Sequence, residues 1–145
     1  MRNQSLKPLS VLAAAVLAVE LMAIGGPGEV FADEAGPAVA SQPLISSAIP
    51  GSNGQALKAF VVNLKPGAKV ASHRHAGTVF VYVLSGTVRS RINTGPIVTY
   101  AAGENWVESP GVTHALMENA SPEQGASILA IFVAPAGDAL TSKGN

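Results

Sequence analysis

The feature that most constrains this chain is a series of short runs rich in β-branched and aromatic residues, each closed by a turn sequence. Valine, isoleucine, phenylalanine and tyrosine favour the pleated backbone, while clusters of glycine, proline and asparagine end strands. Such runs occupy residues 57–64, 79–84, 87–92, 97–100 and 127–133. Many short strands at this spacing predict an all-β fold, either a sandwich or a small barrel closed by two packed sheets.

The composition is that of one ordinary domain with a real core. Of the 145 residues, 48% are hydrophobic and only 12% are charged, which is too apolar for a disordered chain. The formal net charge is zero and there is no basic stripe, so nothing indicates a nucleic-acid partner. The absence of cysteine excludes disulfides, thiolate metal ligands and a cysteine nucleophile.

The amino terminus has the pattern of a secretory signal. Arg2 and Lys7 precede an apolar run over residues 9–19, and Val30-Phe31-Ala32 offers small residues where a signal peptidase reads. The alternative is a membrane anchor, but the run is shorter than the roughly 20 residues that a span needs. We therefore expect a signal peptide over residues 1–32, an exported (periplasmic or secreted) protein, and no stable membrane span after processing.

The rest of the chain divides by composition. Residues 33–55 are rich in Ala, Gly, Pro and Ser and predict an irregular lead-in or a single edge strand. Residues 56–134 hold the strand runs and predict the barrel domain. Residues 135–145 predict a flexible tail.

Histidine is scarce, and its placement indicates a metal site. His73 and His75 are one residue apart, so on a strand their rings would lie on the same face. His114, the third and last histidine, directly follows the turn sequence of residues 109–113. Two imidazoles on one face, with a third delivered from a distant turn, suit a divalent metal ion.

Two stretches resemble the paired motifs of the cupin superfamily. Residues 67–86 are similar to the first motif, which runs Gly, five residues, His-x-His, three or four residues, Glu, six residues, Gly. Residues 103–114 are similar to the second motif, which ends Pro-x-Gly-x-x-His. The resemblance covers about residues 56–134 and implies a single-domain, cupin-2-like, all-β protein: a cupin-like jelly-roll barrel of two packed antiparallel sheets.

The chain departs from these motifs at an important position. Where the family usually carries its metal-binding glutamate, seven residues before Gly86, this chain has Val79. The resemblance therefore implies only His73, His75 and His114 as metal ligands, for Fe, Zn, Mn, Ni or Cu. Three imidazoles leave coordination positions open, as in a catalytic rather than a closed structural site.

Glu108 is the candidate catalytic residue. It lies two residues from Trp106, so both side chains could project from one face of a strand. The functional interpretation is a fourth ligand or a general base beside the metal, with Trp106 forming a wall of the pocket. The alternative is a solvated edge glutamate and a core tryptophan.

The alternation along residues 79–84 predicts which side chains face the barrel interior. If position 79 points inward, so do Val81 and Val83, and Val79 and Val81 would line the pocket. Three apolar side chains then form an outer face that needs a cover: Phe80, Tyr82 and Leu84. The sequence predicts that a second copy covers this face in a homodimer, with the amino-terminal segment as the alternative.

Two main classes of function remain open. The first is a small exported metal-dependent enzyme, of oxygenase or isomerase type, acting on a small organic molecule. The second is a small-ligand-binding or sensing cupin without turnover, and a purely structural role is a third. The fold does not choose among them, so whether the protein is an enzyme stays undecided.

Overall fold

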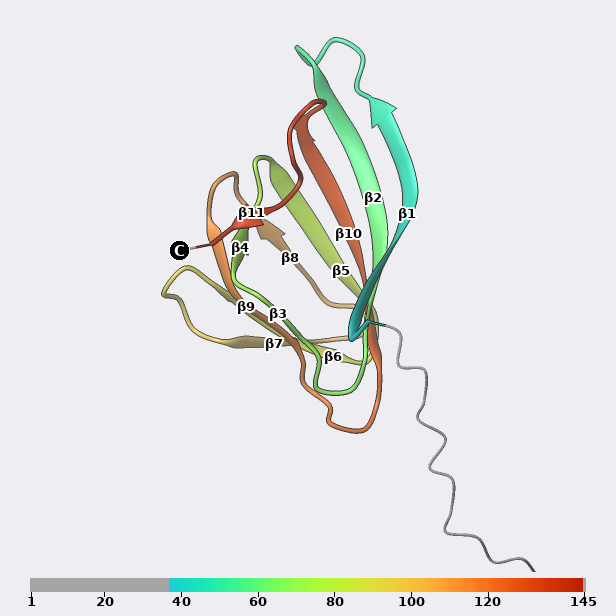
Figure 1. Cartoon of the computed structure of the whole chain (residues 1–145), viewed down its shortest axis with the longest axis vertical. Helices are drawn as coiled ribbons and strands as arrows, with labels where there is room; N and C mark the ends of the chain where they lie inside the picture. Colours follow the sequence, from blue (N-terminus) through green and yellow to red (C-terminus); the bar gives the residue numbers. More distant parts are fainter. Residues whose placement is uncertain (1–36, 145) are drawn as a thin grey trace, which may run out of the picture. The chain divides into compact units, whose positions relative to one another are not determined.

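Two antiparallel sheets face each other in the computed structural model, which describes residues 37–144 (Figure 1). The five-stranded sheet has the order β1 (Val39–Ala48), β2 (Gln55–Leu64), β10 (Ala126–Pro135), β5 (Thr78–Ser85), β8 (Asn105–Glu108). The six-stranded sheet has the order β11 (Ser142–Lys143), β4 (His73–Arg74), β9 (Thr113–Asn119), β6 (Thr87–Ile92), β7 (Val98–Ala101), and β3 (Lys69–Val70) also pairs with β9. This arrangement confirms the predicted all-β jelly-roll barrel.

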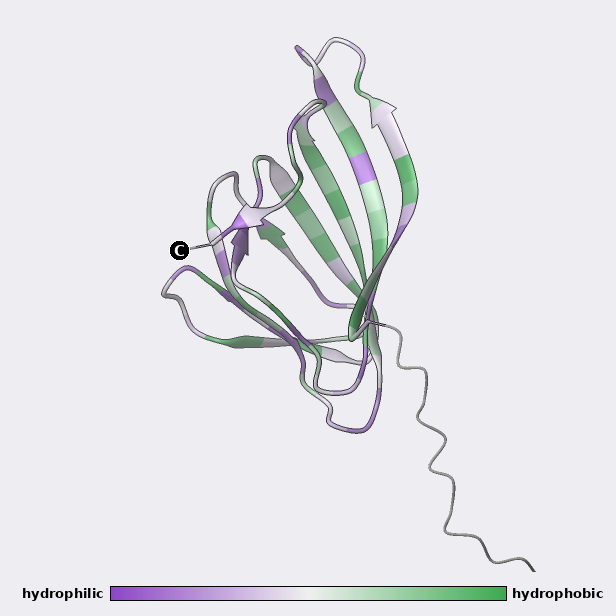
Figure 2. Ribbon diagram, viewed as in Figure 1, coloured by the Kyte–Doolittle hydropathy of each residue, from purple (hydrophilic) through white to green (hydrophobic). Residues whose placement is uncertain are grey.

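The main core lies between the sheets, on the inner face of the five-stranded sheet. Val79, Val81 and Val83 of β5 are at most 2% exposed, and their neighbours on the outer face are half-buried or exposed. The inward direction predicted for these three valines is therefore confirmed. On β10 the same alternation buries Ile128, and Figure 2 shows the apolar character of these central strands.

A glycine turn passes the chain from one sheet to the other. Gly86, between β5 and β6, has φ of 73°, a conformation that residues with a side chain rarely adopt. A Cβ placed there would also lie 2.7 Å from the carbonyl oxygen of Gly125. Both requirements explain why the turn after β5 needs glycine.

The two flanking regions are more regular than composition suggests. Within residues 33–55, the edge-strand alternative holds for β1, which pairs with β2 along nearly its whole length. Within residues 135–145, where the sequence predicts a flexible tail, the described part includes β11, which pairs with β4. A two-residue strand has too little sequence to show a pattern, and backbone pairing alone defines it.

The predicted signal peptide lies outside the described residues. Within residues 37–144, no helix is long and apolar enough to cross a membrane.

Candidate metal centre

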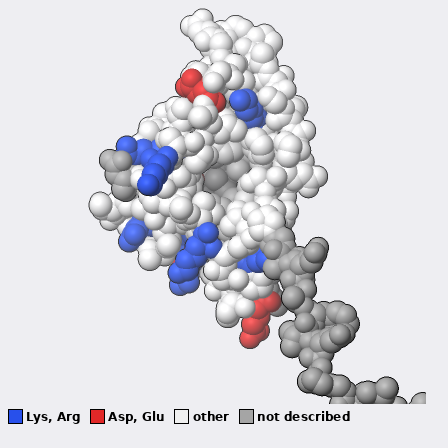
Figure 3. Space-filling model, viewed as in Figure 1, with Lys and Arg blue, Asp and Glu red and all other residues white. Residues whose placement is uncertain are grey.

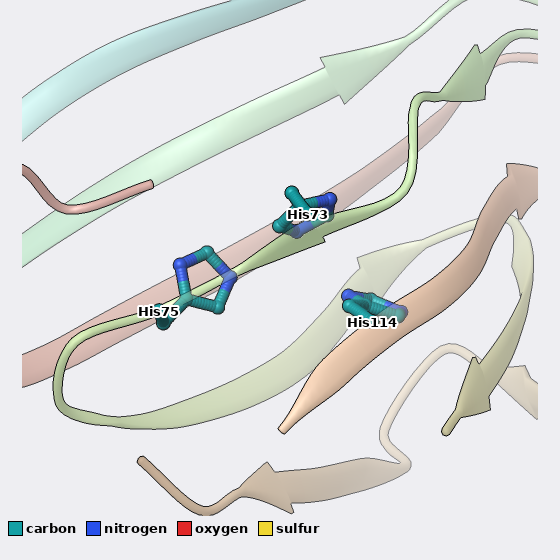
Figure 4. Close-up of side chains that lie close together, drawn as sticks. All are labelled: His73, His75 and His114. Atoms are coloured by element: carbon teal, nitrogen blue, oxygen red, sulfur yellow. The ribbon is translucent and has the colours of Figure 1, made fainter. Parts of the chain in front are cut away.

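Neighbouring strands of the six-stranded sheet bring the histidines together. His73 of β4 pairs directly with His114 of β9, and directly opposite residues of antiparallel strands share a face. His75 follows β4, and the amide of Gly111, in the turn before β9, donates to its carbonyl oxygen at 2.9 Å. All three side chains are buried, and one ring nitrogen from each lies within 4.8 Å of the others (Figure 4). The structure thus places the three predicted ligands in one cluster.

Backbone carbonyl groups orient two of the rings. Nδ1 of His73 donates to the carbonyl oxygen of Ala71 at 2.8 Å, and Nδ1 of His75 donates to that of Leu140 at 2.7 Å. A carbonyl oxygen only accepts, so the proton is on Nδ1 and Nε2 keeps its lone pair. This arrangement is typical of metal-binding histidines, whose second nitrogen is held by a neighbouring group.

The ring of His114 is held differently. Its Nδ1 donates to Oε1 of Glu108 at 3.1 Å, and its Nε2 lies 2.8 Å from the hydroxyl oxygen of Ser90. With the proton on Nδ1, the Ser90 hydroxyl donates to Nε2. A metal ion that binds Nδ1 of His114 would replace the proton that Nδ1 donates to Glu108.

A buried chain of Ser90, His114 and Glu108 has the hydrogen-bond order of a hydrolytic triad. His114 and Glu108 line the cavity between the sheets, but Ser90 is not among the lining residues. A nucleophile must reach its substrate, so Ser90 acts here as a positioning residue for the ring. The sequence offers no spacing signal for Ser90, which sequence reasoning missed.

Glu108 lies among the rings. It is 1% exposed, so the alternative of a solvated edge glutamate is wrong. Its Oε1 also accepts from Nε1 of Trp106 at 3.1 Å, and its Oε2 lies 3.8 Å from Nε2 of His75. Among the described residues, this Oε2 is one of three buried side-chain polar atoms that have no hydrogen-bond partner.

The sequence predicts that Trp106 forms a wall of the pocket. In the structure Trp106 is buried, but it is not among the residues that line the cavity. Its ring stacks on Tyr100 with centroids 4.6 Å apart, and its indole nitrogen holds Glu108. Alternation along β8 does put both side chains on the inner face, but Trp106 is two residues farther from the cluster. Its contacts with the site are the hydrogen bond to Glu108 and an edge-to-face approach to the ring of His114, with centroids 6.1 Å apart.

The electrostatics favour neutral imidazole beside an ionised carboxylate. Burial lowers the pKa of His73, and the nearby His114 and His75 add to this effect, against a hydrogen bond to Ala71 that raises it. Burial alone would raise the pKa of Glu108, but hydrogen bonds from His114 and Trp106 and the nearby imidazoles bring it below its ordinary value. Metal binding requires these same protonation states.

The cluster opens into a cavity of about 440 Å³ between the two sheets. Figure 3 shows a hollow in this region, with mostly uncharged surface around it. Val79 and Val81 line the cavity. Further apolar wall residues include Val62, Val70, Met117, Ile128, Ala130 and Phe132. Cavities of this size and character bind small organic molecules.

The carboxyl-terminal segment contributes to the site, which sequence reasoning missed. Leu140 supplies the carbonyl that orients His75, and Thr141, Ser142 and Lys143 line the cavity. Arg74, between the two histidines, donates from Nε to the hydroxyl oxygen of Thr113 at 2.9 Å.

The donor set fits a divalent ion. In a tetrahedral site, two donor atoms that each lie about 2.1 Å from the metal are about 3.4 Å apart, so ring nitrogens within 4.8 Å of one another need to close by at most about 1.4 Å. The unpartnered oxygen of Glu108 is the kind of buried polar atom that a cation satisfies.

The cupin domain family model matches residues 60–132, about half of the chain and within the predicted barrel range. No protein of curated function matches the sequence.

Several solved structures share the fold. A cupin-like protein from Thermotoga maritima is 17% identical, with a TM-score of 0.57 over 74% of this chain and 76% of its own. KdgF from a Halomonas species is 18% identical, with a TM-score of 0.56 over 71% and 84%. Oxalate decarboxylase from Lactobacillus farciminis, solved with formate, is 18% identical, with a TM-score of 0.52 over 60% of this chain but 26% of its own. These likenesses show a shared fold, and the family match over residues 60–132 shows that the chain belongs to the cupin family.

Proposed function

We propose that this protein is an exported cupin that binds a divalent metal through His73, His75 and His114 and a small organic molecule in the adjoining cavity. The observation that carries the proposal is the convergence of the three buried rings, two of them oriented by backbone carbonyls. A divalent metal held by three imidazoles has open positions, where it can polarise an oxygen atom of a bound ligand.

The surrounding residues suit a ligand with an apolar body and one polar, metal-binding end. The valine, methionine and phenylalanine side chains of the cavity provide apolar contacts, and the polar groups gather at the histidine cluster. Glu108 is ionised at neutral pH and can accept a proton from a ligand there. This favours a metal-dependent enzyme of oxygenase or isomerase type, and a ligand-binding or sensing protein without turnover is the second candidate.

Metal analysis tests the proposal directly. Protein purified from its native compartment should carry about one divalent metal ion per chain. A chelator should lower the thermal unfolding temperature and added metal should restore it, because an ion that binds only the folded state stabilises that state. Metal-free protein whose unfolding temperature does not respond to Fe, Zn, Mn, Ni or Cu would refute the metal site.

Export is a separate part of the proposal and rests on residues 1–32. Cleavage after Ala32 would give a mature chain that begins at Asp33. Intact-mass measurement of protein from the periplasm or the medium should give the mass of residues 33–145. A full-length chain in the cytosol would refute export.

We also propose a homodimer through the outer face of the five-stranded sheet. Phe80 pairs across strands with Val107 on one side and Ile131 on the other, so their side chains form a continuous apolar patch on that face. Val107 is 59% exposed and Leu84 is 44% exposed. A patch of this kind suits a self-complementary two-fold contact.

Sedimentation at micromolar concentration should show twice the chain mass. Val107→Glu should give a monomer, whereas Ile97→Glu, at a similarly exposed position in the turn before β7, should not. A wild-type monomer would mean that another segment covers the patch.

A further inference from the structure

The carboxylate missing from the first motif has a counterpart on the neighbouring strand. Val79 of β5, where the family's glutamate is expected, pairs directly with Glu108, the last residue of β8. Directly opposite residues of antiparallel strands point to the same face, with Cβ atoms about 4.5–5.5 Å apart. Both side chains are 1% exposed and both line the same cavity. A carboxylate thus reaches the expected region from one strand farther along the sheet.

The two oxygens of Glu108 have different surroundings. Oε1 is fixed by Trp106 and His114, whereas Oε2 is buried, has no hydrogen-bond partner and lies 3.8 Å from Nε2 of His75. An unpartnered buried carboxylate oxygen is costly and needs an explanation.

The distances fit coordination of a shared ion. Oε2 of Glu108 lies 3.8 Å from Nε2 of His75, which is below the about 4.2 Å that two metal–ligand bonds can span. Oε2 is thus near enough to share an ion with His75, whereas Oε1 faces Nδ1 of His114 at 3.1 Å.

We propose that Glu108 is the fourth metal ligand and replaces, from β8, the carboxylate that the family carries at the position of Val79. Trp106 is its positioning residue, because the indole hydrogen bond occupies Oε1 and leaves Oε2 for the metal. This inference rests on the proposed three-histidine metal site. The centre would then take ligands from both sheets. The three imidazoles come from segments of the six-stranded sheet, and the carboxylate comes from β8 of the five-stranded sheet.

Zinc titration of variants tests the assignment. Glu108→Gln keeps the size of the side chain and removes its charge, so zinc affinity should fall about 10-fold or more, and the visible spectrum of the Co(II)-loaded protein should change. Glu123→Gln removes an exposed glutamate and should change neither.

A second variant moves the carboxylate from position 108 to position 79, where the family carries its glutamate. The double variant Val79→Glu with Glu108→Val should bind zinc within a few fold of wild type, whereas Glu108→Val alone should be as weak as Glu108→Gln. Failure of the double variant, once folded, to improve on Glu108→Val would count against a shared position for the two carboxylates.

The zinc-loaded wild-type crystal structure decides the matter without any substitution. Oε2 should lie about 2.0–2.2 Å from the zinc ion. Zinc held by the three histidines with Glu108 outside bonding distance, or full affinity in Glu108→Gln, would overturn this inference and leave the proposed function intact. If wild type takes up no metal, both are wrong.

Discussion

The two sheets of this barrel differ in strand length and in the chemistry of their inner faces. Strands β1, β2 and β10 of the five-stranded sheet have ten residues each, and valine, isoleucine and alanine dominate the inner side of its central strands. The six-stranded sheet includes three strands of two residues, and its segments carry all three histidines. The long regular strands bury apolar surface in the core, whereas the short strands beside turns hold polar side chains at the cavity. The fold thus separates the main apolar core from the candidate metal ligands, with Glu108 as the exception.

The largest expected effect comes from the apolar sheet. Leu64 of β2 is 2% exposed in the core, so Leu64→Ala should lower the free energy of unfolding by about 2–5 kcal/mol. Urea denaturation of chelator-treated protein at fixed concentration measures it. Leu44→Ala, at a 54% exposed position of β1, should cost no more than about 0.5 kcal/mol. Equal costs at the two positions would contradict the assignment of stability to this core.

Acid should destabilise the metal-free protein in two steps, one from each sheet. The folded-state pKa of His73 lies below its ordinary 6.5, so the unfolded chain takes up this proton first and stability falls as pH drops through 6.5. The pKa of Glu108 lies below its ordinary 4.5, so its contribution is present above 4.5 and is lost as pH falls through the lower folded value.

Urea midpoints from pH 7.5 down to about pH 3 follow the first step and the onset of the second. Glu108→Gln should remove the lower step and His73→Gln the upper one. A wild-type midpoint that rises on acidification from pH 7 to pH 5 would contradict this assignment.

Loss of the Ser90 hydroxyl should have a smaller effect, confined to the site. Ser90→Ala removes the partner of His114 Nε2, so zinc affinity should fall about 10-fold, with a stability change near 1 kcal/mol. Isothermal titration calorimetry measures the affinity, and Ser47→Ala, at an exposed position of β1, is the control. An unchanged affinity would mean that Ser90 does not orient the ring.

The smallest effect is expected on the outer surface of the six-stranded sheet. Lys69 pairs with Glu118 at 3.0 Å, but its side chain is 70% exposed and Arg89 also pairs with Glu118 at 2.7 Å. Lys69→Ala should therefore cost less than about 0.5 kcal/mol of unfolding free energy, and salt should reduce the difference further. A cost above 1 kcal/mol in urea denaturation would show that this surface contributes more than the comparison of sheets assumes.

Sequence predicted the features that depend on local pattern. Alternation along residues 79–84 gave the inward direction of Val79 and Val81, and the His-x-His spacing gave a shared face for His73 and His75. The pairing of Val79 with Glu108 could not be predicted from the sequence, because strand register depends on contacts between distant segments. For the same reason sequence missed the Leu140 carbonyl, which β11 brings to His75, and the Ser90 hydroxyl.

Calorimetric titration with zinc near pH 7.5, of wild type and His114→Ala, tests the central claim most directly. The account predicts about one zinc ion per wild-type chain and an affinity at least about 100-fold lower in His114→Ala, with the strands of the variant still folded by circular dichroism. Absence of zinc uptake by wild type, or equal binding by a folded His114→Ala, would contradict a metal centre built on the three histidines.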